Sequence, residues 1–422
     1  MLGKKLFDRI HSYQKDADIP GTLEEIFDAG MVRKRAARIY EHVASGHSQH
    51  FTVDLEALSR VGEYTYNVIE QNYPSLEVPP HSRWRHFFVG GVDESQSVLD
   101  SQKTAKERLR VSLELVVTSV LLDAGAGEKW VYFDRVTDQR LTRSEGLALA
   151  SLRMFQDGGF SSDDTMPLKV DPNGLRKLSA GHLGKYFQTS PRNPLLGLDG
   201  RSRLMIGLAD QIETFEEVFK KDGKYRLGHL ADYIVENSVD GAVSLHEVLK
   251  LVLLVFSGLW HGHHTFGKIN LGDTWEHAIL GREEIFPGLI PFHKLSQWLT
   301  YSLLEPLEKY GLKVTEVSSL TGLAEYRNGG LILDLGLIKW KDRALPGPMH
   351  NVGSSLVVEW RALTVYLLDE IADYVRKLAS KPDLQLVNVL EGGTWAAGRK
   401  IARELREDGG PPINLISDGM VF

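Results

Sequence analysis

The sequence predicts a mainly α-helical protein: a compact multi-helix domain with at most a small β-sheet. Three observations predict this fold class. The long apolar segments repeat at spacings of three and four residues, which is the helical period, and the segments with strand character are short and scattered. The composition, 42% hydrophobic and 25% charged over 422 residues, is that of an ordinary globular protein. We expect one compact unit over residues 1–422, with a possible subdivision near residues 160–200.

Three segments carry the helical pattern most clearly. Residues 107–125 begin charged, become apolar on nearly all sides and stop at glycines, which predicts a buried helix with a glycine C-cap. Residues 293–311 place apolar side chains at helical spacings and end at Gly311, which predicts an amphipathic helix kinked at Pro306. Residues 354–378 begin with serines suited to an N-cap and are apolar around most of their first turns, so this helix belongs in the core.

Strand signals are confined to short stretches. Residues 129–135 alternate aromatic and polar side chains before a turn, and residues 413–417 form a second candidate strand. Two segments rich in proline, glycine and aspartate, 161–174 and 339–355, predict loops. A small sheet or hairpin is therefore expected, and a large parallel sheet is not.

Charge and composition narrow the function classes. A net charge of -7 offers no face-wide excess of lysine and arginine, so we expect no nucleic-acid partner. The absence of cysteine excludes disulfides, thiolate metal sites and cysteine nucleophiles. Residues 1–15 carry no apolar signal-peptide run, and the longest apolar stretch, 248–260, contains Lys250 and is too short to span a bilayer. We expect a cytoplasmic protein without a membrane partner, and the oligomeric state stays open.

The most informative run extends from Leu320 to Ile338. It places Glu325, Tyr326 and Arg327 among residues that are mostly apolar or glycine. A carboxylate and a guanidinium in such a setting are costly to bury unless they pair or meet a polar ligand. Glu325 is therefore the first candidate for a catalytic residue.

A second candidate segment, residues 79–91, lies between a Pro-Pro and a Gly-Gly. It contains His81, Trp84, His86 and Phe87 together with two arginines. This density suits a ligand platform, in which an aromatic ring stacks and forked donors hold hydroxyls or carbonyls. A structural loop whose arginines pair with core carboxylates fits the same residues, and both interpretations stay open.

Glu359 and Arg361 are the only charged residues between Leu356 and Leu368. A helix that is apolar on nearly every side is normally buried, so both side chains need interior partners. A structural salt bridge is one interpretation, and orientation of a catalytic carboxylate is the other. We expect Arg361 to pair with Glu359 or Glu325.

Three further patterns suggest a site only weakly. His261, His263 and His264 fit no standard zinc spacing, so we predict no metal and no cofactor. The glycine-rich run from Leu390 lacks the Gly-Lys-Ser/Thr ending of a phosphate loop. Asp418 lies in an Asp-Gly turn, where it is either an exposed turn residue or a ligand-binding one.

Nine motifs are spread over nearly the whole chain: HSRWRHF, LLDAGAG, SEGLALAS, NPLLGLDGR, PFHKLSQWLTYSLLEPLE, LTGLAEYRNGGLILDLG, VVEWRALTV, EGGTWAAGR and SDGMVF. Together they resemble a uracil-catabolism family of fungi and bacteria, the fourth URC gene product. That family is tied to a route of pyrimidine breakdown in which the base is phosphoribosylated, its ring is opened and urea is finally freed. The resemblance implies a step that cleaves a ribosyl-ureido bond.

A fainter likeness links three ordered motifs to the queuosine nucleosidase family, which hydrolyses an N-glycosidic bond on a helical scaffold related to DNA glycosylases. That resemblance implies a distantly DNA-glycosylase-like fold. It also implies that Glu325 stands where that family has an aspartate, so its carboxylate is displaced by about one methylene. The matching residues are Phe292, Lys294, Gln297, Leu320, Thr321, Glu325, Tyr326, Arg327, Leu335, Gly336, Glu359, Arg361 and Thr364.

Together the two resemblances imply an N-glycosidase that releases urea from ribosylurea or its phosphate. Glu325 would oppose the oxocarbenium-like charge, and a neighbouring donor would protonate the leaving group. The expected donors are His81, His86 or Lys294, and the expected binding residues include Trp84, Phe87, Gln297, Tyr326, Arg327 and Asp418. Two alternatives stay open: a non-catalytic subunit that binds pyrimidine metabolites, and a metal-dependent amidohydrolase that uses the histidines at 261–264.

Overall fold

The computed structural model describes residue 2 and residues 6–8, 20–123, 125–127, 129–260, 262–342, 344–345 and 347–416. Helices dominate this part of the chain, and every sheet within it has two strands. The predicted mainly α-helical fold class is confirmed. The expected division near residues 160–200 and the likeness to DNA glycosylases stay predictions.

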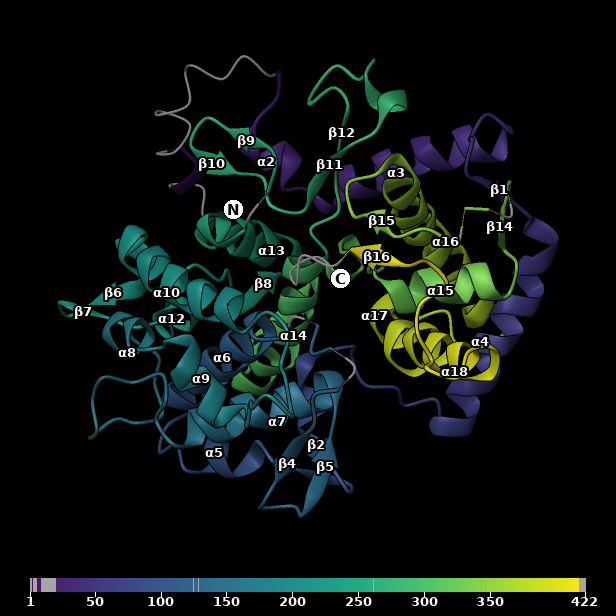
Figure 1. The fold of residues 1–422 in the computed structure, drawn as a ribbon. Helices are drawn as coiled ribbons and strands as arrows, with labels where there is room; N and C mark the ends of the chain where they lie inside the picture. The colour runs from purple at the N-terminus through teal and green to yellow at the C-terminus, as the bar shows by residue number, and fades with distance from the viewer. Residues whose placement is uncertain are drawn as a thin grey trace.

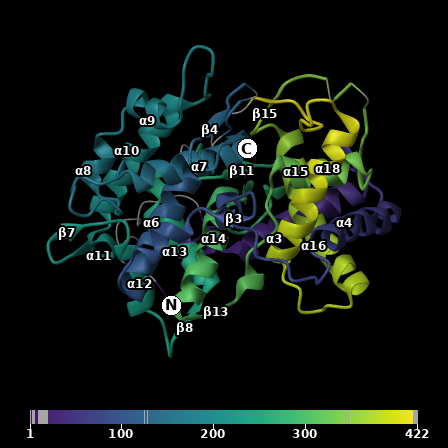
Figure 2. The ribbon, with the colours of Figure 1, turned by 90° about the horizontal axis from the view of Figure 1, so that it is seen from below.

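The helices form two groups on either side of α14 (Lys294–Tyr310), as Figures 1 and 2 show. The first group combines helices from early and late in the chain: α3 (Ala29–Ala44), α4 (Leu58–Asn72), α15 (Tyr326–Asp334), α16 (Ser355–Ala379), α17 (Leu386–Val389) and α18 (Ala396–Leu405). The second group is continuous in sequence: α5 (Gln96–Asp100), α6 (Ala105–Leu121), α7 (Arg143–Gln156), α8 (Pro172–Arg176), α9 (Ala180–Tyr186), α10 (Leu198–Thr214), α11 (Glu216–Phe219), α12 (His229–Glu236) and α13 (Leu245–Val255). The short α2 (Leu23–Ile26) precedes α3.

The three predicted helices are all present. α16 starts after Ser354, whose Oγ accepts the Val357 N–H at 3.4 Å, and α14 ends at Gly311 in the left-handed conformation with φ 109°. The glycine C-cap predicted for the early helix is wrong, because α6 ends at Leu121. The chain leaves the helix there, and Asp123 then turns to the Arg83 guanidinium, 3.1 Å away.

The strands form small pairs around the helices. The predicted strand at 129–135 is β4 (Tyr132–Asp134), which forms a hairpin with β5 (Gln139–Leu141), and that at 413–417 is β16 (Leu415–Ile416), parallel to β15 (His350–Asn351). The other pairs are β1 (Phe51–Val53) with β14 (Ile338–Trp340), β2 (Phe88–Val89) with β3 (Val92–Asp93), β6 (Lys220–Lys221) with β7 (Lys224–Tyr225), β8 (Ala242–Ser244) with β13 (Lys313–Thr315), β9 (Thr265–Phe266) with β10 (Ile269–Asn270), and β11 (Thr274–Glu276) with β12 (Leu289–Pro291).

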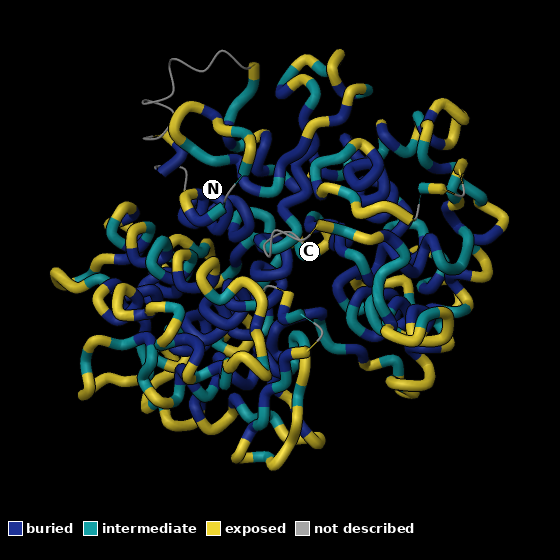
Figure 3. The backbone as a smooth tube through the Cα atoms, in the orientation of Figure 1, coloured by how far each residue is buried: buried dark blue, intermediate teal, exposed yellow. Residues whose placement is uncertain are grey.

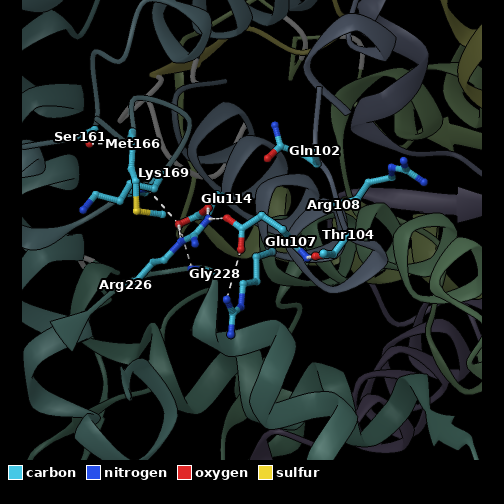
Figure 4. A network of polar contacts seen from close by, with 12 residues as sticks. Gln102, Thr104, Glu107, Arg108, Glu114, Ser161, Met166, Lys169, Arg226 and Gly228 are labelled. Carbon is cyan, nitrogen blue, oxygen red and sulfur yellow. Dashed lines mark hydrogen bonds and ion pairs between the residues drawn. The ribbon is translucent and has the colours of Figure 1, made fainter. Parts of the chain in front are cut away.

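Buried residues lie in the interior of both helix groups, and exposed residues gather on the outer loops (Figure 3). One buried charge organises the second group. Glu114 in α6 accepts two hydrogen bonds from Arg226, at 3.0 and 2.7 Å, and two more from the backbone N–H groups of Val170 and Gly228 (Figure 4). These four bonds satisfy the carboxylate and hold two loops against α6. No described helix is both long enough and apolar enough to cross a membrane.

Candidate active site

A cavity of about 450 Å³ lies between the two helix groups, a volume typical of small-molecule sites. Its walls come from both groups and from α14. Ser144 and Glu145 of α7 lie on one side, and Tyr326 of α15 and Arg399 of α18 lie on the other. A ligand in this cavity would therefore contact both halves of the molecule.

Glu325 lines the cavity as the N-cap of α15. One carboxylate oxygen accepts the Arg327 N–H at 2.7 Å and the other accepts the Asn328 N–H at 2.6 Å. The Asn328 side chain in turn donates to the Leu323 carbonyl at 3.2 Å. These bonds fix the direction of the Glu325 carboxylate, which is 7% exposed and lines the cavity.

Lys294 is the first residue of α14 and also lines the cavity. The preceding residue, His293, has a left-handed φ of 52°, an uncommon conformation outside glycine that often occurs at functional sites. Burial lowers the pKa of Lys294, and the nearby carboxylates of Glu325 and Asp123 oppose that shift. Within the described part of the chain, the Lys294 ammonium has no ion-pair partner within 4.0 Å, so it can meet a ligand.

Arg361 connects the segments that carry Lys294 and Glu325. Its two terminal nitrogens each donate to Asp273 at 2.7 Å, and its Nε donates to the Ala324 carbonyl at 3.1 Å. The Asp273 carboxylate also accepts the Lys294 backbone N–H at 3.0 Å and the Trp275 indole N–H at 2.7 Å. The predicted pairing of Arg361 with Glu359 or Glu325 is wrong, because Asp273 takes both forked donors. Burial raises the pKa of Asp273, but Arg361 and the hydrogen bonds from Trp275 and the Lys294 backbone together outweigh this effect and lower the pKa to about 2.

Two histidines of the segment 79–91 reach the cavity, and they have opposite partners. His81 Nδ1 lies 2.6 Å from the Glu391 carboxylate, which accepts, so Nδ1 carries a proton. His86 Nδ1 lies 3.3 Å from an Arg83 nitrogen, which can only donate, so this Nδ1 accepts. Burial, with a smaller contribution from Arg83, lowers the pKa of His86 to about 3. His86 is therefore neutral at pH 7, with its proton on Nε2.

Two tryptophans enclose the histidines. The Trp395 ring centroid lies 5.6 Å from that of His81 and 5.7 Å from that of His86. Trp298 lies 6.3 and 5.9 Å from the same two rings. Both indoles line the cavity, so they supply its apolar wall.

Trp84 and Phe87 do not line this cavity. The Trp84 indole N–H donates to the Ser302 carbonyl at 2.9 Å, on the side of α14. Ser302 lies four residues before Pro306, whose missing N–H leaves that carbonyl without its helical donor. Phe87 is fully buried and packs edge-on against Trp84, with ring centroids 5.7 Å apart. The two aromatics anchor the 3₁₀ turn η2 (Arg83–Phe87) on α14.

Gln297 and Glu359 also lie outside the cavity. The Gln297 amide donates to the Thr321 hydroxyl at 2.8 Å and accepts the Thr321 N–H at 2.8 Å, which ties α14 to the segment before Glu325. Glu359 accepts a hydrogen bond from Ser48 and lies 3.7 Å from His277 Nε2. Both side chains stabilise the interior around the site.

The remaining sequence candidates fall into two sets. Tyr326 and Arg327 line the cavity. Asp418 and His261 lie outside the described residues, and His264 lies 3.8 Å from Glu276, away from the cavity lining. Among the residues that the structure describes, no group of three histidine, aspartate or glutamate side chains is arranged to hold a metal.

The cavity also contains charged residues that the sequence argument missed, namely Asp123, Arg143, Glu145, Arg399 and Asp408. Asp123 accepts the Ser144 hydroxyl at 3.1 Å besides its contact with Arg83. Burial raises the pKa of Asp123, and Arg83 opposes this shift. A carboxylate directly after a helix apolar on most sides was the available signal for Asp123, and its position beside Arg83 was not visible in the sequence.

Comparison with known proteins identifies the family. The family model described as "Protein of unknown function (DUF1688)" matches residues 25–422. The chain belongs to this family. "Uracil catabolism protein 4" of Lachancea kluyveri is 35% identical over 427 aligned positions, which cover 93% of this chain and 97% of that protein. "Protein urg3" of Schizosaccharomyces pombe is 36% identical over 414 positions, which cover 95% and 99%.

The resemblance predicted from the sequence motifs is thereby confirmed, whereas the likeness to queuosine nucleosidases stays a prediction. In this DUF1688 member six of the nine motifs that carried the resemblance contribute residues to the cavity lining. HSRWRHF supplies His81 and His86, LTGLAEYRNGG supplies Glu325, and EGGTWAAGR supplies Trp395 and Arg399.

Proposed function

We propose that the protein is a hydrolase that cleaves an N-ribosyl bond in uracil catabolism, releasing urea from ribosylurea or its 5'-phosphate. The curated relatives that cover nearly the whole chain supply the metabolic setting. The carrying observation is the Glu325 carboxylate, fixed by two backbone N–H groups in a small-molecule cavity that also holds Lys294.

The proposed reaction breaks the bond between ribose C1' and a urea nitrogen. The bonding electron pair leaves with the nitrogen, which takes up one proton, while a water oxygen bonds to C1' and loses one proton. Positive charge develops on C1' and the ring oxygen, and a carboxylate held beside it stabilises that charge and orients the water. Glu325 fills this role, because its direction is set before the ligand arrives.

Lys294 is the proposed proton donor. A general acid works best when its pKa lies near the working pH, and burial lowers the pKa of Lys294 in that direction. His86 is neutral at pH 7 and serves instead to donate a hydrogen bond from Nε2, for example to the urea oxygen. His81, backed by Glu391, is a second hydrogen-bond donor on the same wall.

The central test replaces Glu325 with glutamine and follows urea release from ribosylurea and from its 5'-phosphate. Glutamine keeps the volume and one N-cap acceptor but removes the negative charge. We expect kcat to fall by about a hundredfold or more, since that is the usual effect of removing one stabilising group from the transition state. Ligand binding should survive, so KM or Kd should change little.

Asp171→Asn is the matched control. Asp171 is also a buried N-cap carboxylate with two backbone donors, the N–H groups of Ser162 and Gly174, both at 2.9 Å, but it lies outside the cavity. Asp171→Asn should lose about as much stability as Glu325→Gln, whereas its kcat should equal that of wild-type protein. If wild-type protein releases no urea from either compound, or Glu325→Gln keeps full activity, the catalytic assignment fails. Binding of either compound without turnover by wild-type protein would instead indicate a metabolite-binding subunit.

A further inference from the structure

Three guanidinium groups line the same cavity: Arg143 from α7, Arg327 from α15 and Arg399 from α18. We propose that these three arginines bind the phosphate group of the substrate, so that the enzyme acts on phosphorylated ribosides. This inference rests on the proposed function for the ribosyl part of the ligand, and the geometry of the arginines supports the phosphate part.

Arg143 and Arg327 are brought together by one short segment. Arg327 Nη1 donates to the Gly409 carbonyl at 2.7 Å, and Arg143 Nη2 donates to the Asp408 carbonyl at 3.2 Å. The two side chains therefore hold consecutive peptide groups. Because each guanidinium has five N–H donors, most donors on both side chains remain for a ligand.

Arg399 joins this pair because α18 packs closely against α15. A Cβ atom on Gly398 would lie 2.2 Å from the Arg327 carbonyl oxygen, so only glycine permits this approach. Arg399 stacks over the Trp395 ring at 4.8 Å, and Arg327 stacks over Tyr326 at 4.7 Å. Stacking fixes the planes of both guanidiniums, which favours forked hydrogen bonds to oxyanions.

The positive charge of the three arginines is only partly compensated. Glu145 pairs with Arg399 at 2.6 Å. In the described part of the chain, no carboxylate lies within 4.0 Å of Arg143 or Arg327, whose contacts above are to neutral carbonyls and a ring. The Asp408 carboxylate on this wall accepts the Gly410 N–H at 2.8 Å. Burial lowers the pKa of Arg327, and repulsion from Arg143 and Arg399 adds to the shift despite the opposing influence of Tyr326 and Glu325.

A phosphate monoester is the ligand group that best completes this arrangement. It carries a charge of about -1.5 to -2 at pH 7 and three acceptor oxygens, which match two uncompensated guanidiniums and a third that is stacked in place. Neither urea nor ribose carries a negative charge, so a ribosylurea without phosphate would leave Arg143 and Arg327 uncompensated in a partly buried site. A sugar carboxylate offers a single negative charge and two oxygens.

The test measures binding by titration calorimetry, without turnover, using ribose 5-phosphate, ribose and ribonate as probes. We expect wild-type protein to bind ribose 5-phosphate at least tenfold more tightly than ribose or ribonate. Arg143→Gln should weaken ribose 5-phosphate binding by about tenfold and leave ribose binding unchanged, since it removes one charge-assisted contact. The affinity of Arg143→Lys for ribose 5-phosphate should lie between those of wild-type protein and Arg143→Gln, because lysine keeps the charge but lacks the forked donors.

Arg203→Gln is the control for loss of one positive charge, because Arg203 is exposed on α10 and does not line the cavity. It should bind like wild-type protein. Three results would each overturn the inference. They are equal affinity for ribose 5-phosphate and ribose, tighter binding of ribonate than of ribose 5-phosphate, and an Arg143→Gln variant that binds ribose 5-phosphate as tightly as wild-type protein does. Phosphate-dependent binding without urea release would support the anion site while contradicting the hydrolase assignment, so the two failures are distinguishable.

Discussion

His81 and His86 share one wall of the cavity, yet their environments assign them different hydrogen-bonding states. A carboxylate accepts from His81 Nδ1, whereas a guanidinium donates to His86 Nδ1. The sequence shows only two histidines five positions apart between prolines and glycines. Their difference comes from Glu391 and Arg83, and burial of His86 then decides its charge.

The neutral state of His86 makes stability depend on pH. Its pKa in the folded protein is about 3, below the ordinary 6.5, so the unfolded chain binds a proton that the folded state rejects between these values. The stability that the neutral His86 contributes to the folded protein is fully present above pH 6.5. It is lost as the pH falls from 6.5 toward 3, by up to about 1.4 kcal/mol per pH unit. His86→Asn keeps an acceptor for Arg83 but cannot titrate, so its urea midpoint should fall less between pH 6.5 and 5 than that of wild-type protein.

Helix α14 contains a proline in its fourth turn and continues through it, because another element satisfies the carbonyl that the proline leaves unpaired. Pro306 removes the N–H that would reach Ser302, and the Trp84 indole replaces it at 2.9 Å. The Ser302 hydroxyl also accepts the Arg83 backbone N–H at 2.9 Å. The proline thereby creates the docking point for η2, which carries His86 to the cavity.

This pairing predicts coupling between Trp84 and Pro306. Trp84→Phe keeps the ring but leaves the Ser302 carbonyl buried without a donor, so thermal unfolding should reflect a loss of about 1–3 kcal/mol. In a Pro306→Ala background the helix supplies its own N–H, so the same Trp84→Phe change should cost clearly less. Equal losses of melting temperature in both backgrounds would show that the indole bond and the proline are independent. Phe187→Leu, a conservative core change at a ring that packs against Trp130, should cost the same in both backgrounds.

The sequence predicted helices and strands better than it predicted which residues contact one another. The physical reason is that secondary structure follows from neighbouring residues, whereas tertiary contacts join residues far apart in the chain. Helical periodicity is local, so residues 293–311 and 354–378 were identified as helices. The carboxylate partner of Arg361 lies 88 positions away, and no local pattern encodes it. Glu325 was singled out because charge in an apolar run is itself a local signal, and Lys294 because it belongs to a motif of the resemblance to queuosine nucleosidases. Trp84 and Phe87 were expected in the site because an aromatic side chain suits a ligand wall and a core anchor equally well.

Across the whole molecule, Arg361 ties the walls of the cavity together. It extends from α16 to Asp273, which holds the start of α14, and to the Ala324 carbonyl beside Glu325. The proposed acid and the proposed carboxylate are thus positioned through one guanidinium. The family match over residues 25–422 covers all of these parts, which fits a site assembled from the entire chain.

Arg361→Met should therefore lower both stability and urea release. Removing one partner of a buried ion pair leaves Asp273 charged and uncompensated, at a cost of about 3–5 kcal/mol. The double variant Arg361→Met with Asp273→Asn removes the unpaired charge and should recover part of the melting temperature, but not the activity. An unchanged melting temperature in the single variant would mean that the Arg361–Asp273 pair contributes nothing to the fold.

The first helix group also constrains how the protein can be made. Arg33 in α3 pairs with Asp369 in α16, 336 positions later, at 2.9 Å. During synthesis, the apolar faces of α3 and α4 therefore stay exposed until α16, which covers them in the folded protein, has left the ribosome. The helices of the second group are continuous in sequence, so they can pack against one another much earlier in synthesis. The nascent chain is thus expected to need chaperone protection on its N-terminal helices for most of its synthesis, and the cavity is completed only when these helices and the late segments meet.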